Sequence, residues 1–193
     1  MSTDQTDHPD HRILSDEIEV IEEAIGDRLR DRGETLAVVE SLTGGRVCSR
    51  LTSIPGASDY FDRGVVAYSN DAKQTALGVS RESLDADGAV SESVAAELAR
   101  GIRDTATTTW GVSTTGIAGP TGGSPDKPVG LVYIGVAYAG PWGSQSSFAR
   151  VDRHVFDGDR LAVTQQSATQ ALIALSDAID SVDESAKSEE SET

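Results

Sequence analysis

The sequence predicts an α/β fold, a three-layer α/β/α sandwich around a mixed, mostly parallel sheet. Two observations carry this prediction. Short apolar segments rich in β-branched residues alternate with longer segments in which apolar residues recur every three or four positions, the pattern of strands alternating with amphipathic helices. Late in the chain, two strand-like segments follow one another with no helix between them. We therefore expect an antiparallel hairpin at one side of an otherwise parallel sheet.

The first half of the chain begins with a polar segment, 1–14, which predicts a disordered leader. A helix should follow from Ser15, as N-cap, to about Arg32, because Ile18, Ile21, Ile25 and Leu29 recur at helical spacing. The next expected elements are a strand over 36–39, a helix over 45–52, a strand over 64–68 and a helix over 70–77.

The second half should begin with a helix capped by Ser91 and ending near Ala106. After it we expect a strand over 110–115, a loop rich in glycine and proline over 116–128, strands over 129–139 and 145–155, and a helix over 159–182. The last residues, 183–193, are acidic and poor in apolar side chains, so they predict a disordered tail. The whole segment 15–182 is interpreted as a single domain.

Composition limits the classes of function. The 193 residues contain no long apolar run and no signal-peptide pattern, so we expect a soluble, cytoplasmic protein without membrane contact. The single cysteine, Cys48, excludes an internal disulfide and a CxxC site, and we interpret it as a small core residue. The three histidines form no cluster with ligand spacing, so neither a metal nor a cofactor is expected.

The charge balance is strongly acidic. Thirty-two Asp and Glu residues face 16 Lys and Arg residues, for a net charge of −16, and only three of the 16 are lysines. Such a surface repels nucleic acid, which disfavours a DNA- or RNA-binding role. Excess carboxylates with few lysines also suggest adaptation to high salt, where screening removes the self-repulsion of the surface.

Unusual polar residues follow three of the predicted strands, over 41–45, 68–73 and 114–123. If these strands are parallel, the three segments meet at one edge of the sheet, where open α/β sheets bind ligands. Known motifs do not explain them: no Gly-Lys-Ser/Thr follows the glycine-rich loop, and no GxSxG elbow or histidine accompanies Ser41.

A serine without a histidine needs another base, and Lys73 is the nearest candidate. Burial lowers the pKa of a lysine, so that its neutral amine can accept the proton of Ser41. Tyr68 could hydrogen-bond within this pair, and the backbone amides of Thr43, Gly44 and Gly45 could hold an oxyanion or a phosphate. The alternative is purely structural, with a helix-capping turn, a surface lysine, a half-buried tyrosine and a flexible loop.

The order of these motifs and their amino-acid sequences resemble those of the CinA C-terminal family, the nicotinamide-nucleotide amidohydrolases. The resemblance covers roughly Glu34 to Ala178 and includes the segments ESLTGGRV, PGASDYF, GVVAYSNDAKQTALGV, GAVSESVA, TTGIAGPTGGSPDKPVGLVYIGV and FDGDR. Leu42 stands where the family usually has cysteine, a change that puts no catalytic atom in doubt. The domain often fused before this module is absent from the sequence, so we expect the stand-alone form.

The resemblance implies hydrolysis of the carboxamide of nicotinamide mononucleotide, in pyridine nucleotide recycling, by an α/β/α enzyme without a metal that forms homodimers or larger homo-oligomers. It implies that Ser41 is the nucleophile, Lys73 the base and Tyr68 their hydrogen-bonding partner. The residues then expected to bind the rest of the substrate or its oxyanion are Thr43, Gly44, Gly45, Thr115, Gly116, Gly119, Thr121, Gly122, Gly123 and Arg160. Within this set, the segment 119–123 is the expected phosphate cradle. Arg160 is either a clamp on an anionic group or an ion-pair partner of Asp157 or Asp159.

Two alternatives remain open. The domain could bind a nucleotide and regulate a partner without turnover, as an interaction module of the competence- and damage-inducible type. It could also act on another amide or nucleotide, because the sequence predicts the reaction type better than the shape of the pocket.

Overall fold

The computed structural model describes residues 12–191. Its sheet has five strands in the order β2-β1-β3-β4-β5. Strand β1 is parallel to β2 and to β3, whereas β4 is antiparallel to both β3 and β5. The predicted mixed sheet and its late hairpin are confirmed, but parallel pairing makes up half of the sheet and not most of it. The strands are β1 Leu36–Glu40, β2 Phe61–Val66, β3 Trp110–Gly116, β4 Leu131–Tyr138 and β5 Phe148–Val155.

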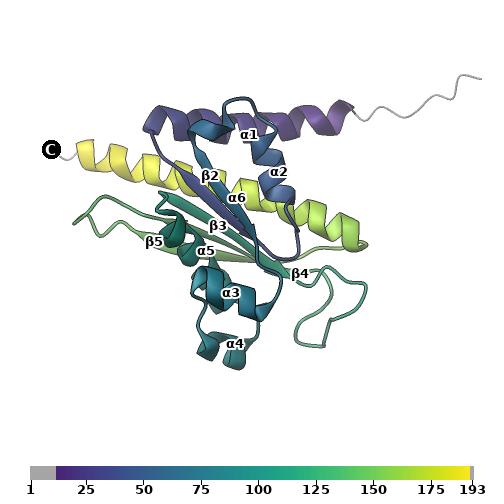
Figure 1. The fold of residues 1–193 in the computed structure, drawn as a ribbon. Helices are drawn as coiled ribbons and strands as arrows, with labels where there is room; N and C mark the ends of the chain where they lie inside the picture. The colour runs from purple at the N-terminus through teal and green to yellow at the C-terminus, as the bar shows by residue number, and fades with distance from the viewer. Residues whose placement is uncertain (1–11, 192–193) are drawn as a thin grey trace, which may run out of the picture.

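Helices cover both faces of the sheet, as the predicted three-layer sandwich requires (Figure 1). One layer contains α1 Arg12–Arg32, α2 Arg46–Thr52 and α6 Arg160–Ser191. The opposite layer contains α3 Asn70–Leu77, α4 Arg81–Asp87 and α5 Glu92–Ala106. Among the described helices, none combines the length and the apolar character needed to cross a bilayer.

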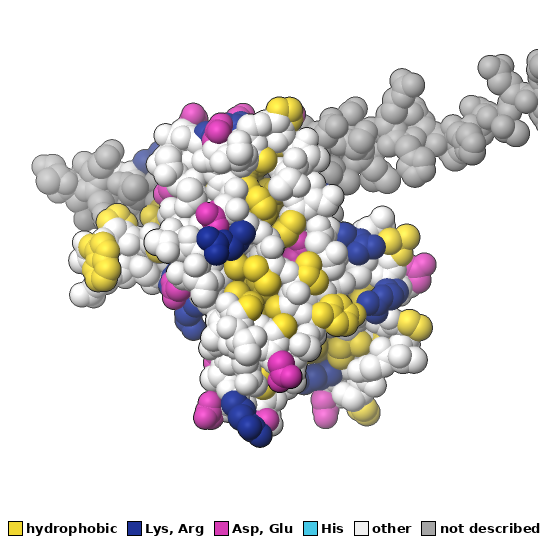
Figure 2. Space-filling view, viewed as in Figure 1, with side chains coloured by type: hydrophobic (Ala, Val, Ile, Leu, Met, Phe, Trp, Pro, Cys, Tyr) yellow, Lys and Arg dark blue, Asp and Glu magenta, His cyan; other side chains and the backbone are white. Residues whose placement is uncertain are grey.

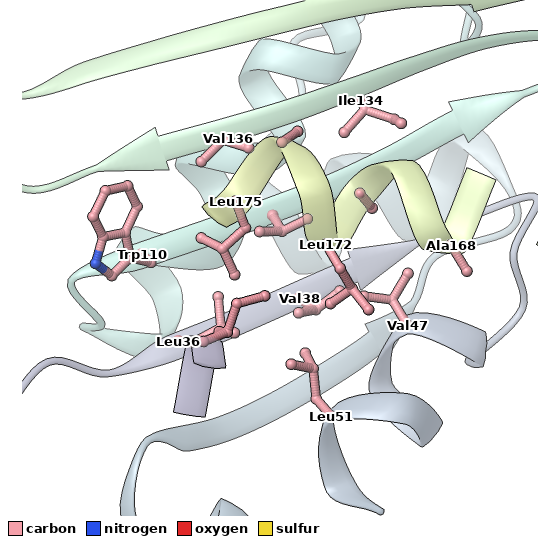
Figure 3. Close-up of a cluster of buried hydrophobic side chains, with 14 of the residues drawn as sticks. Leu36, Val38, Val47, Leu51, Trp110, Ile134, Val136, Ala168, Leu172 and Leu175 are labelled. Carbon is pink, nitrogen blue, oxygen red and sulfur yellow. The ribbon is translucent and has the colours of Figure 1, made fainter. Parts of the chain in front are cut away.

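Strand β1 shows how the two layers divide the core. Its five residues are all buried. Leu36 and Val38 belong to the cluster under α1, α2 and α6, in which Leu172 of α6 packs (Figure 3). Ala37 and Val39 belong to the cluster under α3 and α5. This alternation follows from the two-residue period of a strand, and it explains why a central strand covered on both faces is apolar throughout.

Strand β2 lies at an edge of the sheet and is much more exposed than β1. The strand lies near the middle of the face in Figure 2, where hydrophobic side chains gather at the surface. The strand begins at Phe61, three residues before the predicted start at Gly64. Gly64 itself is required by packing, because a Cβ there would lie 2.2 Å from the sulfur of Cys48. Cys48 therefore packs between α2 and β2, and burial raises the pKa of its thiol.

Helix α5 has the Ser91 cap that the sequence predicts, and α3 has a serine cap that was not predicted. The hydroxyl of Ser69 accepts the amide of Ala72 at the start of α3, and Ser91 accepts that of Val94 at the start of α5. Gly78 ends α3 in the left-handed conformation that favours glycine. The prediction missed α4, a two-turn helix capped by Ser80.

Helix α1 begins at Arg12, so Ser15 lies within the helix and does not cap it. The predicted leader before Arg12 lies outside the described residues. Ile25 and Leu29 are fully buried and Ile21 packs beside them, as predicted. The side chain of Ile18 lies outside the described ones.

Helix α6 extends to Ser191, past the predicted end at Val182. The segment predicted to be a disordered tail is therefore helical as far as it is described. An ion pair joins Asp183 to Arg32 of α1 and holds the turn that follows Val182. Most of the residues beyond it are serine, glutamate, alanine and lysine, several of which are good helix formers. Low apolar content predicted disorder here, but the contact with α1 favours the helix.

Candidate active site

The carboxyl ends of β1, β2 and β3 lie level with one another, as predicted. Glu40 pairs in register with Val66 of β2 and with Thr114 of β3. Just beyond, the amide of Ser41 donates to the carbonyl of Thr114 at 3.0 Å, and the amide of Ala67 donates to that of Glu40 at 2.9 Å. The three polar segments that follow these strands therefore share one edge of the sheet.

Ser41 and Lys73 meet at this edge. The Nζ atom of Lys73 lies 3.3 Å from the Oγ atom of Ser41, 2.9 Å from the carbonyl oxygen of Ala67 and 3.2 Å from that of Tyr68. Lys73 comes from the first turn of α3, and only 1% of the residue is exposed. It is therefore not the surface lysine of the structural alternative.

Burial lowers the pKa of Lys73. Within the described part of the chain no carboxylate forms an ion pair with it, so no nearby negative charge opposes this shift. A neutral lysine amine has two N–H groups and one lone pair. The carbonyls of Ala67 and Tyr68 can accept the two N–H groups, which leaves the lone pair for the hydroxyl proton of Ser41.

Glu40, which comes directly before Ser41, is a site residue that the sequence analysis did not assign. Its carboxylate is fully buried and accepts two backbone N–H groups, from Gly45 and from Cys48, each at 2.8 Å. It thereby fixes the turn between β1 and α2, which has Gly44 and Gly45 at φ angles of 61° and 98°. The signal was present in the sequence, because a helix that begins after two glycines lacks a side-chain cap and needs another acceptor.

This role of Glu40 corrects the predicted oxyanion site. The amide of Gly45 already donates to Glu40 and is not available to a ligand. The amides of Leu42, Thr43 and Gly44 donate to no protein acceptor in the described region. Leu42 is 5% exposed and fills the space beside Gly116, whose added Cβ would lie 3.0 Å from Leu42 Cδ1.

Two threonines of the predicted site use their hydroxyl groups within the fold. Thr43 Oγ1 lies 2.7 Å from Thr114 Oγ1, and both residues are fully buried. Thr115 Oγ1 donates to the carbonyl of Ala89 at 2.7 Å. These bonds hold β3 to the turn after β1 and to the segment before α5.

A cavity of about 270 Å³ surrounds Ser41 and Lys73. Beside these two, the predicted site residues at its wall are Tyr68, Thr115, Gly116, Gly119, Thr121, Gly122 and Arg160. Thr43, Gly45 and Gly123 are not at this wall. Gly123 instead packs within its own loop, where an added Cβ would lie 2.8 Å from the amide nitrogen of Val129.

The side chain of Tyr68 is not placed as predicted. Its phenol accepts a hydrogen bond of 2.9 Å from Arg160 Nη2, and the residue is 61% exposed. Only its backbone carbonyl contacts Lys73. Tyr68 follows the end of an edge strand, and its phenol contacts Arg160 at the start of α6. The predicted hydroxyl contact with the Ser41–Lys73 pair is therefore absent from the described site.

Arg160 joins three segments of the cavity. Besides Tyr68, it contacts the carbonyl of Gly119, to which Nη1 donates at 3.0 Å. The ion pair considered with Asp157 or Asp159 is not formed, because Asp159 instead accepts the amide of Ala162 at 2.8 Å and caps α6.

A second cavity of about 750 Å³ adjoins the first and shares four wall residues with it. Gly44 of the predicted site lies at this wall, together with Arg46, which the sequence analysis did not single out. Arg46 Nη1 donates to the carbonyl of Thr43 at 2.9 Å. A basic residue directly after paired glycines was the available signal.

Lys127 holds the glycine-rich loop in place. Its Nζ atom donates to the carbonyl of Val90 at 2.7 Å and to that of Asp87. Ala89 and Val90 line the Ser41 cavity, so this lysine connects two sides of the cavity wall. In the part of the chain that the structure describes, no group of three His, Cys, Asp or Glu residues has metal-site geometry.

Comparison with known proteins identifies the family. The sequence model of the CinA C-terminal domain matches residues 18–179. The chain belongs to the CinA C-terminal domain family. A CinA-like protein of Salinibacter ruber is 49% identical over 152 residues, which make up 79% of this chain and 35% of that protein. A putative competence-damage inducible protein of Moorella thermoacetica is 47% identical over 163 residues, or 84% of this chain and 38% of that protein.

Solved structures of the superfamily share the fold. A CinA superfamily protein from Enterobacter cloacae has a TM-score of 0.78 at 30% identity, over 93% of this chain and 98% of that one. The competence/damage inducible protein CihA from Agrobacterium tumefaciens has a TM-score of 0.76 at 36% identity, over 82% and 95% of the two chains. The present chain spans about a third of the length of the curated relatives it matches.

Proposed function

We propose that this chain is an amidohydrolase that converts nicotinamide mononucleotide to nicotinic acid mononucleotide and ammonia. The observation that carries the reaction type is the contact of 3.3 Å between the buried Lys73 amine and the Ser41 hydroxyl, at the wall of a cavity. The substrate is inferred from the chain's resemblance to the nicotinamide-nucleotide amidohydrolases of its family.

In the first half of the reaction, neutral Lys73 accepts the hydroxyl proton of Ser41 as Oγ attacks the carboxamide carbon. A C–O bond forms, and the carbonyl oxygen becomes the oxyanion of a tetrahedral intermediate. The ammonium of Lys73 then gives its proton to the amide nitrogen as the C–N bond breaks. Ammonia leaves, and the nicotinoyl group remains on Ser41 as an ester.

In the second half, water replaces ammonia. Lys73 is neutral again and accepts a proton from the water that attacks the ester carbonyl. The C–O bond to Ser41 breaks, and the serine recovers its proton from Lys73. Nicotinic acid mononucleotide leaves as a carboxylic acid, which gives its proton to water and becomes the carboxylate. The carbonyls of Ala67 and Tyr68 hold the lysine in both protonation states.

The oxyanion needs hydrogen-bond donors that are already in place. The amides of Leu42, Thr43 and Gly44 suit this role, because the turn after Ser41 is fixed by Glu40 and these amides have no protein acceptor among the described residues. This assignment moves the predicted donor set one residue toward Ser41, away from Gly45.

The direct test is ammonia release from nicotinamide mononucleotide by the purified protein in molar KCl. Ser41→Ala should fold normally and lose more than about a thousandfold in kcat, since only binding and oxyanion stabilisation remain. Thermal melting of both proteins controls for folding. Activity of the variant within about tenfold of wild type would make Ser41 a structural residue. Absence of ammonia with wild type at every salt concentration would favour a non-catalytic nucleotide-binding module.

A further inference from the structure

Two adjoining cavities meet at the turn that follows Ser41. The Ser41 cavity measures about 270 Å³, which is below the range of about 300–1,000 Å³ that holds a whole small ligand. The neighbouring cavity measures about 750 Å³ and shares the wall residues Leu42, Tyr68, Ala118 and Arg160. If the carboxamide of the proposed substrate lies at Ser41, the second cavity is the adjoining space that could take the remainder of the nucleotide.

The second cavity has two arginines at its wall, Arg46 and Arg160. Both donate to neutral oxygen atoms, Arg46 to Thr43 and Arg160 to Gly119 and Tyr68. Neither forms an ion pair with any carboxylate of the described residues. In a chain with twice as many acids as bases, two unpaired guanidinium groups on one cavity indicate an anionic ligand.

Arg46 is held against the turn that contains Ser41, residues 41–45, here called the nucleophile turn. One of its five N–H donors contacts the carbonyl of Thr43, and its Nη1 atom lies 3.9 Å from the position of a Cβ added to Gly44. The remaining donors are free for a ligand. The single acid at the wall, Asp159, already accepts the amide of Ala162.

We propose that Arg46, acting with Arg160, binds the 5′-phosphate of the mononucleotide and makes the site select phosphorylated substrates. This inference rests on the proposed function. Of the predicted cradle over 119–123, only Pro120 lies at the wall of the second cavity, whereas Gly119, Thr121 and Gly122 line the Ser41 cavity. The proposal therefore moves the phosphate away from the amides of that loop and toward the two arginines. Guanidinium groups match a phosphate with two parallel hydrogen bonds, which lysine or a backbone amide does not provide.

The test compares two substrates that differ only in the phosphate, nicotinamide mononucleotide and nicotinamide riboside. Arg46→Gln should lower kcat/KM for the mononucleotide by about tenfold to a hundredfold, the effect of losing a hydrogen bond to a charged group. Most of the loss should be in KM, and kcat/KM for the riboside should stay unchanged. Arg46→Lys should recover only part of the loss. Arg81→Gln, on exposed α4, removes the same charge and should change neither substrate.

Equal losses for both substrates would overturn the inference, because Arg46 would then act by holding the Thr43 carbonyl of the nucleophile turn. No loss for either substrate would overturn it as well. A binding measurement separates the inference from the proposed reaction. Calorimetry should show that the Ser41→Ala protein binds nicotinic acid mononucleotide. Adding Arg46→Gln to that protein should weaken this binding by about tenfold to a hundredfold. Binding that depends on Arg46 without turnover by wild type would keep the phosphate site and reject the hydrolase.

Discussion

Lys73 combines burial with complete hydrogen bonding. An isolated ammonium in a protein interior is costly, and a lysine in such a place lowers its pKa until the neutral form becomes accessible. Three oxygen atoms surround Nζ, so the protonated form is also satisfied. An amine that is held in both states is suited to accept a proton and to return it.

The identity of this base can be tested by Lys73→Arg. A guanidinium remains protonated at any accessible pH and cannot act as a base. We expect kcat for nicotinamide mononucleotide to fall by at least about a hundredfold, the contribution typical of general base catalysis. Lys187→Arg, at an exposed position of α6 that lines neither cavity, is the matched control and should retain full activity. A Lys73→Arg protein as active as wild type would make Lys73 a charge partner.

The pH dependence of kcat/KM tests the same residue without a substitution. Burial lowers the pKa of Lys73, and the inactive form is the protonated one. Activity should therefore be low at acid pH and rise along one limb, with a midpoint well below the ordinary lysine value of about 10.4. The profile is measured at constant high ionic strength. A flat profile over about pH 6 to 9 with a fall beyond would mean that Lys73 acts as a cation.

At the scale of elements, the joint between β1 and α2 depends on one carboxylate. Glu40 accepts the amides of Gly45 and Cys48, and so it takes the place of the side-chain cap that Gly45 cannot supply. Its negative charge lies at the positive end of the helix, a favourable arrangement. The turn that contains Ser41 is thereby fixed between a buried strand and a capped helix.

Glu40→Gln should disturb this joint. One oxygen acceptor becomes an NH₂ donor facing a backbone N–H, which should cost about 1–3 kcal/mol of folding stability and displace Ser41. We expect both Tm and kcat to fall. Glu97→Gln is the matched control, because Glu97 accepts the amide of Ser80 and two hydroxyls at the start of α4, away from both cavities. That variant should have a lower Tm and an unchanged kcat. Full kcat in Glu40→Gln would exclude a positioning role.

At the scale of the whole molecule, charge dominates. Acidic side chains are scattered over the face in Figure 2, and several arginines pair with carboxylates between helices, as Arg28 does with Asp180 and Arg32 with Asp183. Each pair uses one acid and one base, so one-to-one pairing of all 16 basic residues would still leave half of the 32 acids over and the net charge at −16. Self-repulsion among the remaining carboxylates should destabilise the compact state at low ionic strength.

We therefore expect Tm to rise substantially between dilute buffer and multimolar KCl. Salt shortens the screening length from about 30 Å at 0.01 M to about 3 Å at 1 M, which removes the repulsion. Calorimetry at neutral pH measures the change, and sucrose at matched osmolality controls for the general stabilisation by excluded solutes. Equal melting temperatures at both salt concentrations would contradict adaptation to high salt.

Much of the fold could be predicted because its signals are local. The apolar run of β1, the Ser91 cap of α5 and the late hairpin each depend on residues close in sequence. Parallel strands bring their carboxyl ends to one edge, so the meeting of Ser41 with Lys73 also followed from the order of elements. A missed helix and shifted element ends are the local errors.

The other features of the site depend on contacts between residues that are far apart in the sequence. The sequence by itself determined which residues could react, because their chemical types and their places at strand ends do not depend on the packing. Only the tertiary structure decided that the Tyr68 phenol contacts Arg160, that Glu40 takes the amide of Gly45, and that Arg46 joins Arg160 at a second cavity. The physical reason is that a long or charged side chain has several partners within reach along the chain, and the packing of distant elements selects one.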